Sequence, residues 1–489
     1  MTNPSGKEEN GHTTRSGRDF SRIRIEHWDA VARRDDRGKG WGGTYRDYLS
    51  KIYRFLVPSG QSVLELGCGQ GDLLASLKPS RGVGVDFSAA MIEPGRQHHP
   101  EIRFICDDIH HLELEETFDY IILSDIVNDL WDVQRVFEGI RKFCHSRTRI
   151  LLNFYSHLWE KPLEQAQKLG MATPTLPQNW LTVDDVTNLL YLTGFEVIRA
   201  WPEILLPVRI PFLSSLMNRY AVRVWPFRWF ALTNFIVARP SPKTAAADTP
   251  LPLVSVLVPA RNEAGNISRI FAQVPEMGRG TELVFVEGHS QDETYEAIEK
   301  AIAEHPERSC LLFRQTGKGK GDAVRLGFSR ATGDVLMILD ADLTVPPEDL
   351  PRFLAALTSG KAEFVNGVRL VYPMEHRAMR FFNLLGNKFF SLAFSWLLGQ
   401  SIKDTLCGTK VMWREDYRHI EENRSYFGDF DPFGDFDLIF GAAKLNLKIV
   451  DLPVRYRERT YGSTQIQRWS HGWLLLKMVA FAARRIKFI

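Results

Sequence analysis

The chain has 489 residues, of which 44% are hydrophobic and 25% are charged, and its formal net charge is only +2. This length exceeds one ordinary core and the composition is that of globular protein, so roughly two to four domains are expected. A charge balance this close to neutrality argues against nucleic acid as a partner.

Cysteine usage and hydropathy bear on the compartment. The five cysteines are scattered without metal-ligand spacing, which favours a reducing cytosol over a disulfide framework. The first residues lack the apolar run of a secretory signal peptide. No stretch of about 18 uncharged apolar residues predicts a transmembrane helix. These features predict a cytoplasmic protein.

The first half of the chain alternates between strand-like and helical patterns. Residues 1–20 are polar and are predicted to form a disordered tail. From residue 21 to 239 the alternation predicts a doubly wound α/β domain with a buried parallel sheet. The predicted strands are Ser62–Leu66, Gly82–Asp86, Ile102–Cys106, Tyr120–Leu123 and Arg149–Phe154.

A linker and a second alternation follow. Residues 240–252 are rich in proline and small residues, which cannot build a core and favour extended backbone. A second doubly wound α/β domain is predicted for residues 253–489. Its expected strands are Val254–Pro259, Glu282–Val286, Cys310–Phe313 and Val335–Leu339.

Three glycines mark the first candidate site. Gly67, Gly69 and Gly71 directly follow a predicted strand, where residues without a Cβ allow a tight turn and close approach to a ligand. Such a turn also occurs in dinucleotide-binding enzymes. Their GxGxxG pattern, when it starts at Gly67, requires glycine at position 72, where this chain has Asp72. Glu65 precedes the loop, where a carboxylate can organise the methionine end of S-adenosylmethionine.

Two aspartates end neighbouring strands. Asp86 is placed to accept both hydroxyls of a ribose, and Asp108 is placed to meet an adenine amino group. The alternative is that both are ordinary polar strand ends. Ser124 and Asp125 could face a substrate or serve the structure alone. No residue stands out as a general base, and His110 and His111 are candidates that also fit ordinary loop positions.

The first half resembles the class I S-adenosylmethionine-dependent methyltransferases. The resemblance rests on VLELGCGQGDLLASL, GVGVDFSAAMI, CDDIHHL and FDYIILSDIV and covers about residues 40–200. It implies a Rossmann-like fold, S-adenosylmethionine as cofactor, and cofactor contacts from Gly67, Gly69, Asp86 and Asp108. It leaves the methyl acceptor open.

The second candidate site lies at the end of an apolar strand. Asp340 and Asp342 are two residues apart in extended backbone, so their carboxylates point the same way. Both can meet one hard cation such as Mg²⁺ or Mn²⁺, which would neutralise charge on a nucleoside-diphosphate leaving group. Helix capping or chance would explain such a pair equally well when it stands alone.

Further motifs accompany this pair along the second half. Strand-to-loop segments run over 256–263, which ends at Glu263, and over 284–294, which contains Glu287. A flexible cationic loop is expected at 317–323. Segments at 404–410 and 459–464 complete the set. Together they resemble the family 2 glycosyltransferases of GT-A type, and within that family the polyprenyl-phosphate sugar transferases, over about residues 253–465.

This second resemblance implies roles for individual residues. Asp340 and Asp342 would hold the metal, and Glu263 and Glu287 the nucleoside, although the family usually has Asp at position 287. The residues expected to contact the nucleotide sugar or the acceptor are Pro259, Arg261, Glu263, Glu287, Lys320, Lys410 and Arg459.

The nature of the acceptor decides whether a base is needed. A hydroxyl acceptor would need a general base, for which Asp435 and Asp437 are the available carboxylates. A lipid phosphate is already anionic and would need none. The alternative for Asp435 is a carboxylate stabilised at a helix N-terminus.

Two acid-free segments combine basic and apolar residues. Residues 376–400 place Phe382, Leu385, Phe389, Leu392 and Trp396 on one helical stripe, with Arg377, Arg380 and Lys388. Residues 468–489 are similar in composition. Such segments can lie in a membrane interface, so a peripheral contact with the inner face of a membrane is expected. Packing on the domain or a dimer contact is the alternative.

The sequence thus predicts a bifunctional transferase. Its substrates would be S-adenosylmethionine, a nucleotide-diphosphate sugar donor, and a lipid-phosphate or glycan acceptor reached by inverting transfer. Three alternatives stay open. The first half could be a non-catalytic S-adenosylmethionine-binding regulatory module or a dinucleotide oxidoreductase. The second half could be a non-catalytic surface for lipid or glycan.

Overall fold

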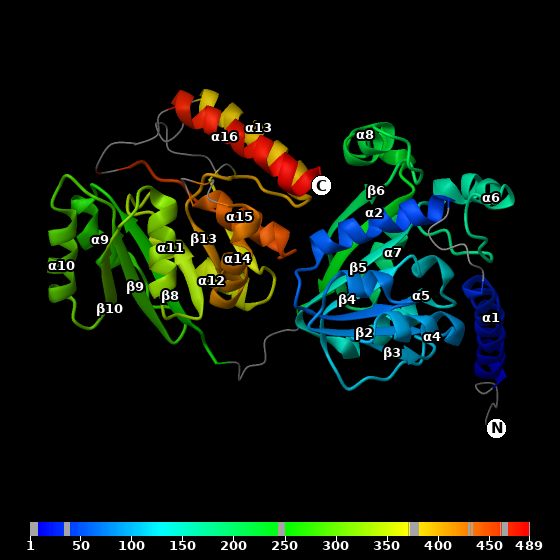
Figure 1. The fold of residues 1–489 in the computed structure, drawn as a ribbon. Helices are drawn as coiled ribbons and strands as arrows, with labels where there is room; N and C mark the ends of the chain where they lie inside the picture. The colour runs from blue at the N-terminus through cyan, green and yellow to red at the C-terminus, as the bar shows by residue number, and fades with distance from the viewer. Residues whose placement is uncertain are drawn as a thin grey trace, which may run out of the picture. The chain divides into compact units, whose positions relative to one another are not determined.

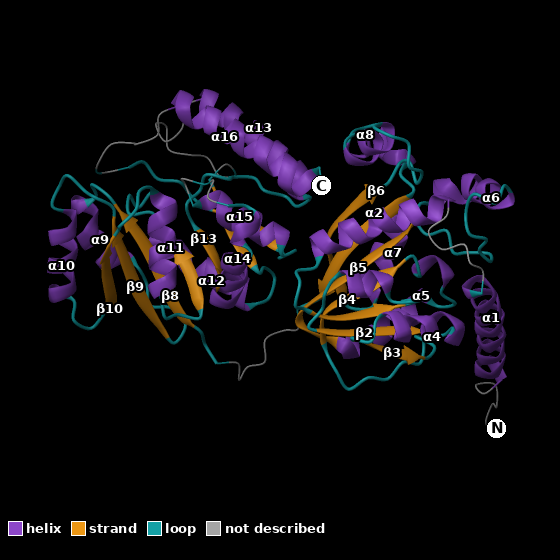
Figure 2. Cartoon of the chain, viewed as in Figure 1, coloured by secondary structure: helices purple, strands orange, loops and turns teal. Residues whose placement is uncertain are grey.

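The protein consists of two compact units, Met1–Ser241 and Pro242–Ile489. The computed structural model describes residues 8–33, 40–242, 250–369, 371, 381–428, 431, 434–459, 461 and 468–488. Each unit is built around one seven-stranded sheet with helices packed against it (Figures 1 and 2).

The first sheet has the order β3-β2-β1-β4-β5-β7-β6. Strand β7 runs antiparallel to both β5 and β6, and the other neighbouring pairs are parallel. The carboxyl ends of the parallel strands therefore lie at one edge. The strands are β1 Ser62–Leu66, β2 Arg81–Asp86, β3 Ile102–Cys106, β4 Phe118–Ser124, β5 Cys144–Tyr155, β6 Phe195–Glu203 and β7 Thr233–Pro240.

Helices cover both faces of this sheet (Figure 2). The α-helices are α1 Glu8–Ala32, α2 Gly40–Leu56, α3 Asp72–Ser76, α4 Ala89–His98, α5 Val133–Ile140, α6 Glu160–Lys168, α7 Val183–Leu192 and α8 Leu213–Arg219. Short 3₁₀ turns include η1 Val127–Asp129, η3 His157–Trp159, η4 Ala221–Arg223 and η5 Phe227–Phe230.

The second sheet has the order β10-β9-β8-β11-β13-β12-β14. Strands β10, β9, β8 and β11 are parallel, and β13 is antiparallel to its two neighbours. The strands are β8 Leu253–Ala260, β9 Gly280–Glu287, β10 Ser309–Arg314, β11 Val335–Ile338, β12 Phe364–Val368, β13 Lys410–Trp413 and β14 Ile449–Pro453.

The second unit has helices on both faces of its sheet and two long apolar helices, α13 and α16, that pack side by side (Figure 1). The α-helices are α9 Ile267–Gln273, α10 Thr294–Glu304, α11 Lys320–Arg330, α12 Leu350–Thr358, α13 Phe381–Leu398, α14 Arg414–Glu422, α15 Asp435–Lys444 and α16 Arg468–Ala482. Among the described residues, none of the helices has the length and apolar character needed to cross a bilayer.

The predicted strands coincide with observed ones. In β1 and β11, Val63, Leu64, Leu336 and Met337 are fully buried because helices cover both faces of a central parallel strand. That burial is why these strands read as continuous apolar runs instead of alternating ones. Each unit has its own contiguous apolar core.

The N-terminal region differs from the prediction of a disordered tail at 1–20. Helix α1 begins at Glu8 and is held by tertiary contacts. Arg24 donates to the Asp129 carboxylate at 2.8 Å, and the Phe20 ring lies 5.0 Å from that of Trp131. Because these partners come from about a hundred residues away, the local polar composition did not reveal them.

The boundary between the units also differs in detail from the predicted linker. Pro240 belongs to β7, and β8 begins at Leu253. Of the predicted linker at 240–252, residues 243–249 lie outside the described part of the chain.

Candidate functional site

The glycine loop of the first unit connects β1 to α3. Gly67, Gly69 and Gly71 have φ angles of 72°, 53° and 77°, a region that only glycine enters at little cost. A Cβ on Gly71 would lie 2.6 Å from the Phe104 ring, whereas a Cβ on Gly69 would meet nothing within 4 Å. The loop therefore packs tightly at Gly71 and leaves open space above Gly69.

Asp86 at the end of β2 ties this loop to its neighbour. Its carboxylate accepts hydrogen bonds of 2.9 Å from the Gly69 and Ser88 N–H groups. Burial raises the pKa of Asp86, and the two N–H donors oppose that rise. A carboxylate thus lies beside the open space, and its contact with a ribose stays a prediction.

Glu65 has a contact that the sequence did not indicate. Its side chain is buried and accepts a 3.1 Å hydrogen bond from the Leu74 N–H in the first turn of α3. Burial raises the pKa of Glu65 to about 8. The carboxyl group therefore orients the helix that follows the glycine loop, where a ligand contact was expected.

Asp108 is engaged from two directions. One oxygen lies 2.7 Å from His110 Nδ1, and the other accepts a 2.9 Å hydrogen bond from Ser21 in α1. Burial acts to raise the pKa of Asp108, but the contacts with His110 and Ser21 outweigh it and lower the pKa. Helix α1 also places Asp29 2.5 Å from the Ser88 hydroxyl, so it reaches the ends of both β2 and β3.

A polar cluster at the ends of β4 and β5 went largely unrecognised in the sequence. Asp125, with φ of 56°, accepts hydrogen bonds from Tyr45 at 2.8 Å and from Asn153 at 2.6 Å. Asn153 in turn accepts one from Tyr53 at 2.7 Å. Burial raises the pKa of Asp125 to about 7. Asp125 was noted as a strand end, but nothing local indicated its distant partners.

In the second unit, Arg459 joins two strand ends. Its guanidinium lies 2.5 Å from Asp342 after β11 and 3.5 Å from Glu263 after β8. Asp342 also accepts hydrogen bonds from Thr344. Burial raises the pKa of Glu263 to about 7, although Asn266 and Arg459 act to lower it. Three residues singled out in the sequence therefore meet at one sheet edge.

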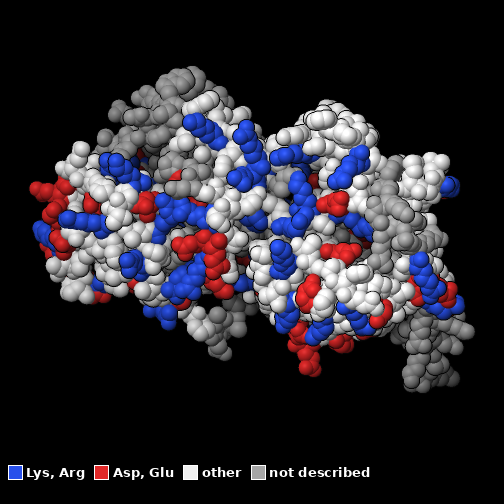
Figure 3. Space-filling view, in the orientation of Figure 1, with Lys and Arg blue, Asp and Glu red and all other residues white. Residues whose placement is uncertain are grey.

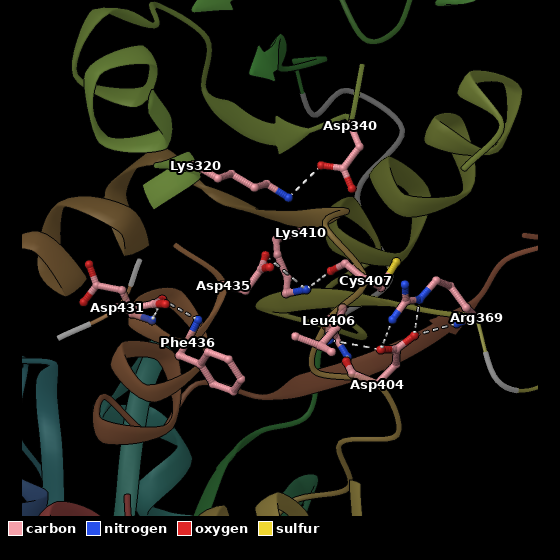
Figure 4. A network of polar contacts seen from close by, with 12 residues as sticks. Lys320, Asp340, Arg369, Asp404, Leu406, Cys407, Lys410, Asp431, Asp435 and Phe436 are labelled. Atoms are coloured by element: carbon pink, nitrogen blue, oxygen red, sulfur yellow. Dashed lines mark hydrogen bonds and ion pairs between the residues drawn. The ribbon is translucent and has the colours of Figure 1, made fainter. Parts of the chain in front are cut away.

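Lys320 and Asp340 form a second pair at this edge. Lys320 Nζ donates to Asp340 at 2.6 Å, and Figure 4 shows the two side chains pointing toward each other. Burial acts to raise the pKa of Asp340, but Lys320 lowers it overall. A Cβ on Gly408 would lie 2.1 Å from the Asp340 carboxylate, so any other residue at 408 would displace this pair from its present position.

The predicted flexible loop at 317–323 ends earlier than expected. Lys320 is the first residue of α11, preceded by Gly319 with φ of 85°. Gly319 adopts a positive φ that a β-carbon would hinder. The side chain of Lys320 therefore extends from the first turn of a helix and not from a flexible loop.

Lys410 is buried, whereas the sequence predicted a contact with the nucleotide sugar or the acceptor. It is fully buried in β13, donates to the Cys407 carbonyl, and lies 3.7 Å from Asp435 (Figure 4). One oxygen of Asp435 is buried without a hydrogen bond. Asp437 lies two residues further along α15, and its carboxylate is 3.0 Å from the Arg424 guanidinium.

A buried ion pair beneath this edge was not found in the sequence. Arg369 after β12 binds Asp404 through two contacts of 2.7 and 2.9 Å, as Figure 4 shows. Arg369 lowers the pKa of Asp404 against the effect of burial. The only sequence signal was Asp404 in a motif segment, and its partner lies 35 residues earlier.

The remaining predicted residues lie around the same edge. Pro259 is in β8 and Arg261 is exposed just beyond it. Glu287, at the end of β9, is buried and accepts a 2.5 Å hydrogen bond from the Ser290 N–H. Glu287 thus shapes the loop after β9.

The carboxylates at this edge bear on whether a divalent metal could bind here. Within the described part of the chain, no group of three or more His, Cys, Asp or Glu is arranged to hold a metal ion. Asp340 and Asp342 supply the carboxylate oxygens that hard cations prefer, and each is already paired with a cationic side chain. The donor chemistry fits a cation that substrate phosphates and water would complete.

The predicted apolar stripe of α13 lies partly on the surface. Phe389, Leu392 and Trp396 are exposed, as are Trp473 and Leu476 of α16. Arg377 and Arg380 lie outside the described residues, and the side chains of Phe382 and Leu385 are likewise not described.

Two family models match the chain. Residues 58–194 match a methyltransferase domain, and residues 255–420 match glycosyl transferase family 2. The predicted order of the two domains is confirmed. So is the fold class of two doubly wound α/β domains, a Rossmann-like methyltransferase fold followed by a GT-A type fold.

Several known proteins are similar to parts of the chain. Dolichol-phosphate mannosyltransferase of Pyrococcus furiosus is 27% identical over 48% of this chain and 67% of its own length. Undecaprenyl-phosphate 4-deoxy-4-formamido-L-arabinose transferase of Pectobacterium carotovorum is 27% identical over 43% and 62%. The chain therefore spans about two thirds of these curated relatives. The solved S-adenosylmethionine-dependent methyltransferase of Mesorhizobium loti is 17% identical over 41% of this chain and 100% of its own, with a TM-score of 0.32.

The packing of the glycine loop predicts how substitutions at Gly71 and Gly69 change the free energy of unfolding. Gly71→Ala should lower the free energy of unfolding by about 2–5 kcal/mol, because positive-φ strain adds to a clash with the Phe104 ring. Gly69→Ala has the strain alone and should cost about 1–2 kcal/mol. Chemical denaturation of both variants without ligand measures the difference, and equal losses would contradict this packing.

The buried Glu65 generates a pH prediction. Between the ordinary pKa of 4.5 and about 8, the unfolded chain has lost a proton that the folded protein keeps, so Glu65 makes stability fall as the pH rises through this window. Glu65→Gln lacks that loss and should gain on the order of a few kcal/mol relative to wild type between pH 4.5 and 8. Denaturation curves of the two proteins at several pH values test this, and parallel stability profiles would refute it.

Proposed function

Because the protein is a transferase in which a methyltransferase domain precedes a family 2 glycosyltransferase domain, we propose that it is bifunctional. The first domain transfers a methyl group from S-adenosylmethionine. The second transfers a sugar from a nucleotide-diphosphate sugar, with inversion, to a polyprenyl phosphate or a glycan. The observation that carries the proposal is that each sheet presents partly buried carboxylates at the carboxyl edge of its parallel strands.

In the first domain, the open space at Gly69 would receive the cofactor. Asp86 beside it would bind the ribose hydroxyls, and Asp108 lies at the end of the next strand to meet the adenine. S-Adenosylmethionine supplies an already activated methyl group. The chain's main task is then to align the acceptor with that group and to exclude water.

The cluster around Asp125 would serve an acceptor that must lose a proton. Its carboxyl group has a pKa of about 7 and so can accept a proton near neutral pH. Tyr45 and Asn153 fix its orientation through hydrogen bonds. This cluster suits the role better than His111 or His110, whose ring is bonded to Asp108.

In the second domain, Glu263 and Glu287 would bind the nucleoside, with Pro259 and Arg261 beside them. Lys320 and Arg459 would contact the diphosphate. A divalent cation held by Asp340 and Asp342 would neutralise charge on the leaving nucleoside diphosphate. Donor binding would then exchange the present pairs of Asp340 with Lys320 and of Asp342 with Arg459 for contacts with the cation and the phosphates.

A polyprenyl phosphate is the acceptor that the relatives favour, because two of them are named for dolichol phosphate and undecaprenyl phosphate. Such an acceptor is anionic and needs no base. The position of Asp435 is consistent with that, since its charge is opposed by buried Lys410 at 3.7 Å. The exposed apolar side chains of α13 and α16 would contact the inner face of a membrane where such a lipid resides.

The alternative for the first domain is a regulatory module that binds S-adenosylmethionine without catalysis. Calorimetric binding of S-adenosylmethionine without methyl transfer to any component of a cell extract would favour this alternative. The positive φ of Asp125 favours catalysis, because backbone strain of this kind concentrates at active sites.

The cofactor assignment predicts a binding defect. Asp86→Ala should weaken S-adenosylmethionine binding by at least about a hundredfold, since each hydrogen bond to a charged group contributes about 1.5–3 kcal/mol. Calorimetric titration measures the dissociation constant, and Glu93→Ala, an exposed carboxylate on α4, is the matched control. Unchanged binding in Asp86→Ala would refute the assignment.

The metal assignment predicts a second defect. Asp342→Ala should lower manganese-dependent hydrolysis of a panel of UDP- and GDP-sugars by at least about a hundredfold, as expected when a charge-stabilising contact is lost. It should also abolish manganese binding measured by calorimetry. Glu348→Ala, an exposed carboxylate paired with Arg457, should behave as wild type. Full manganese binding by Asp342→Ala would rule out this site.

A further inference from the structure

The segment that connects β6 to β7, residues 204–232 and here called the insertion, lies at the same sheet edge as the glycine loop. Strand β6 ends at Glu203 and β7 begins at Thr233, and these two residues are register partners. Thr233 also pairs with Tyr155 at the end of β5. The chain therefore leaves and re-enters the sheet at the carboxyl edge of the parallel strands, and Figure 1 shows α8 beyond the end of β6.

The insertion is ordered by polar contacts. Asn218 accepts hydrogen bonds of 2.8 Å from the Leu205 and Leu206 N–H groups and donates to the Leu206 carbonyl at 2.7 Å. Arg223 forms a buried ion pair with Glu203 at 2.5 Å. The backbone is thus held in one arrangement even though its apolar cluster contains only Leu205, Val222 and Ala231 as buried members.

Most large apolar side chains of the insertion face solvent. Phe212 is 92% exposed, Trp225 69%, and Trp229 and Phe230 61% each. The rings of Trp225 and Trp229 lie 6.4 Å apart. A concentration of exposed apolar side chains of this kind marks an interaction surface in place of a core. Together, the exposed side chains are Ile210, Phe212, Leu213, Leu216, Tyr220, Val224, Trp225, Phe227, Trp229 and Phe230.

The exposed charges within the segment have one sign. No Asp or Glu occurs from residue 204 to 242. Arg209 and Arg228 are exposed, and Arg219 lies half-buried over the Tyr220 ring. Lys51 of α2 is exposed and interacts electrostatically with Arg219. Partial burial lowers the pKa of Lys51, and the positive charge of Arg219 lowers it further. In Figure 3 this end of the first unit is largely white and bordered by blue side chains.

We propose that residues 204–232 bind the surface of an anionic lipid bilayer. Tryptophan and other aromatic side chains partition to the headgroup region, and arginine and lysine are attracted to anionic headgroups. Because the insertion shares its sheet edge with Gly69 and Asp86, membrane binding would turn that edge toward the bilayer. The methyl acceptor would then be carried by the membrane, an inference that rests on the proposed function, whereas the lipid contact itself does not.

A second copy of the chain fits this surface less well. A two-fold contact sets the same patch against itself, so Arg209 and Arg228 would face their own copies without a carboxylate from the insertion to pair with. An anionic headgroup layer supplies that missing charge and accepts apolar side chains beneath it.

Vesicle binding of the full-length protein tests the proposal. Wild type should co-sediment with phosphatidylcholine vesicles that contain phosphatidylglycerol and much less with pure phosphatidylcholine vesicles. Trp225→Ser/Trp229→Ser should lower the partition coefficient by at least about tenfold, given the apolar area removed. Arg209→Gln/Arg228→Gln should lower it on the anionic vesicles alone. Tyr191→Ser/Leu192→Ser, which removes exposed apolar side chains from α7, should bind as wild type.

Hydrogen exchange locates the contact. Anionic vesicles should slow amide exchange within 207–230. Undiminished vesicle binding by the tryptophan variant would assign membrane contact to α13 and α16 and overturn the proposal. Self-association that this variant abolishes in the absence of lipid would overturn it in favour of a dimer.

Calorimetric S-adenosylmethionine binding by the same variants separates this proposal from the previous one. Retained cofactor binding with lost vesicle binding shows that the first unit is folded and supports the lipid contact. Vesicle binding in a protein that binds no cofactor would leave the lipid contact supported while the methyltransferase proposal fails.

Discussion

Parallel strands bring their carboxyl ends to one edge of a sheet, and this constraint governs both halves of the molecule. In the first unit it places the loop after β1 next to Asp86 at the end of β2, so that Asp86 accepts from the Gly69 N–H. In the second it places the residues after β8 and β11 close enough for Arg459 to contact both Glu263 and Asp342. Residues far apart in sequence become one site because strand direction is shared.

Buried charge imposes the next requirement. A carboxylate removed from water must be paired or must keep its proton, and the two units meet this requirement differently. In the second, Asp340, Asp342 and Asp404 are paired with Lys320, Arg459 and Arg369. In the first, the described residues give Glu65 and Asp125 hydrogen-bond donors but no bonded cation, and burial raises their pKa values to about 8 and about 7. Glu263 is the exception at the second edge, because burial raises its pKa to about 7. The ion pairs of Asp340, Asp342 and Asp404 suit a polyanionic donor, whereas the raised pKa of Asp125 suits transfer of a proton.

Exposed apolar surfaces occur in both units and bear on the partners of the protein. Helices α13 and α16 and the insertion between β6 and β7 expose aromatic side chains without acidic neighbours in their own segments. If both units act at a membrane, one lipid-linked molecule could receive a sugar from one domain and a methyl group from the other. The fusion would then keep both domains at the same surface and raise the local concentration of the shared intermediate.

The sequence by itself determined the two domains, their fold class and the strand-end residues, because apolar runs, glycine turns and the carboxylates after them are local patterns. It could not determine which of those residues reach a ligand. Glu65 orients α3, Lys410 is buried beside Asp435, and residues 8–20 belong to a helix instead of a disordered tail. Asp125 gains its partners from Tyr45 and Asn153, and Asp404 gains Arg369, only once the strands are aligned. Pairing, burial and the exposure of residues 204–232 depend on contacts between distant segments, so the tertiary structure alone decided them.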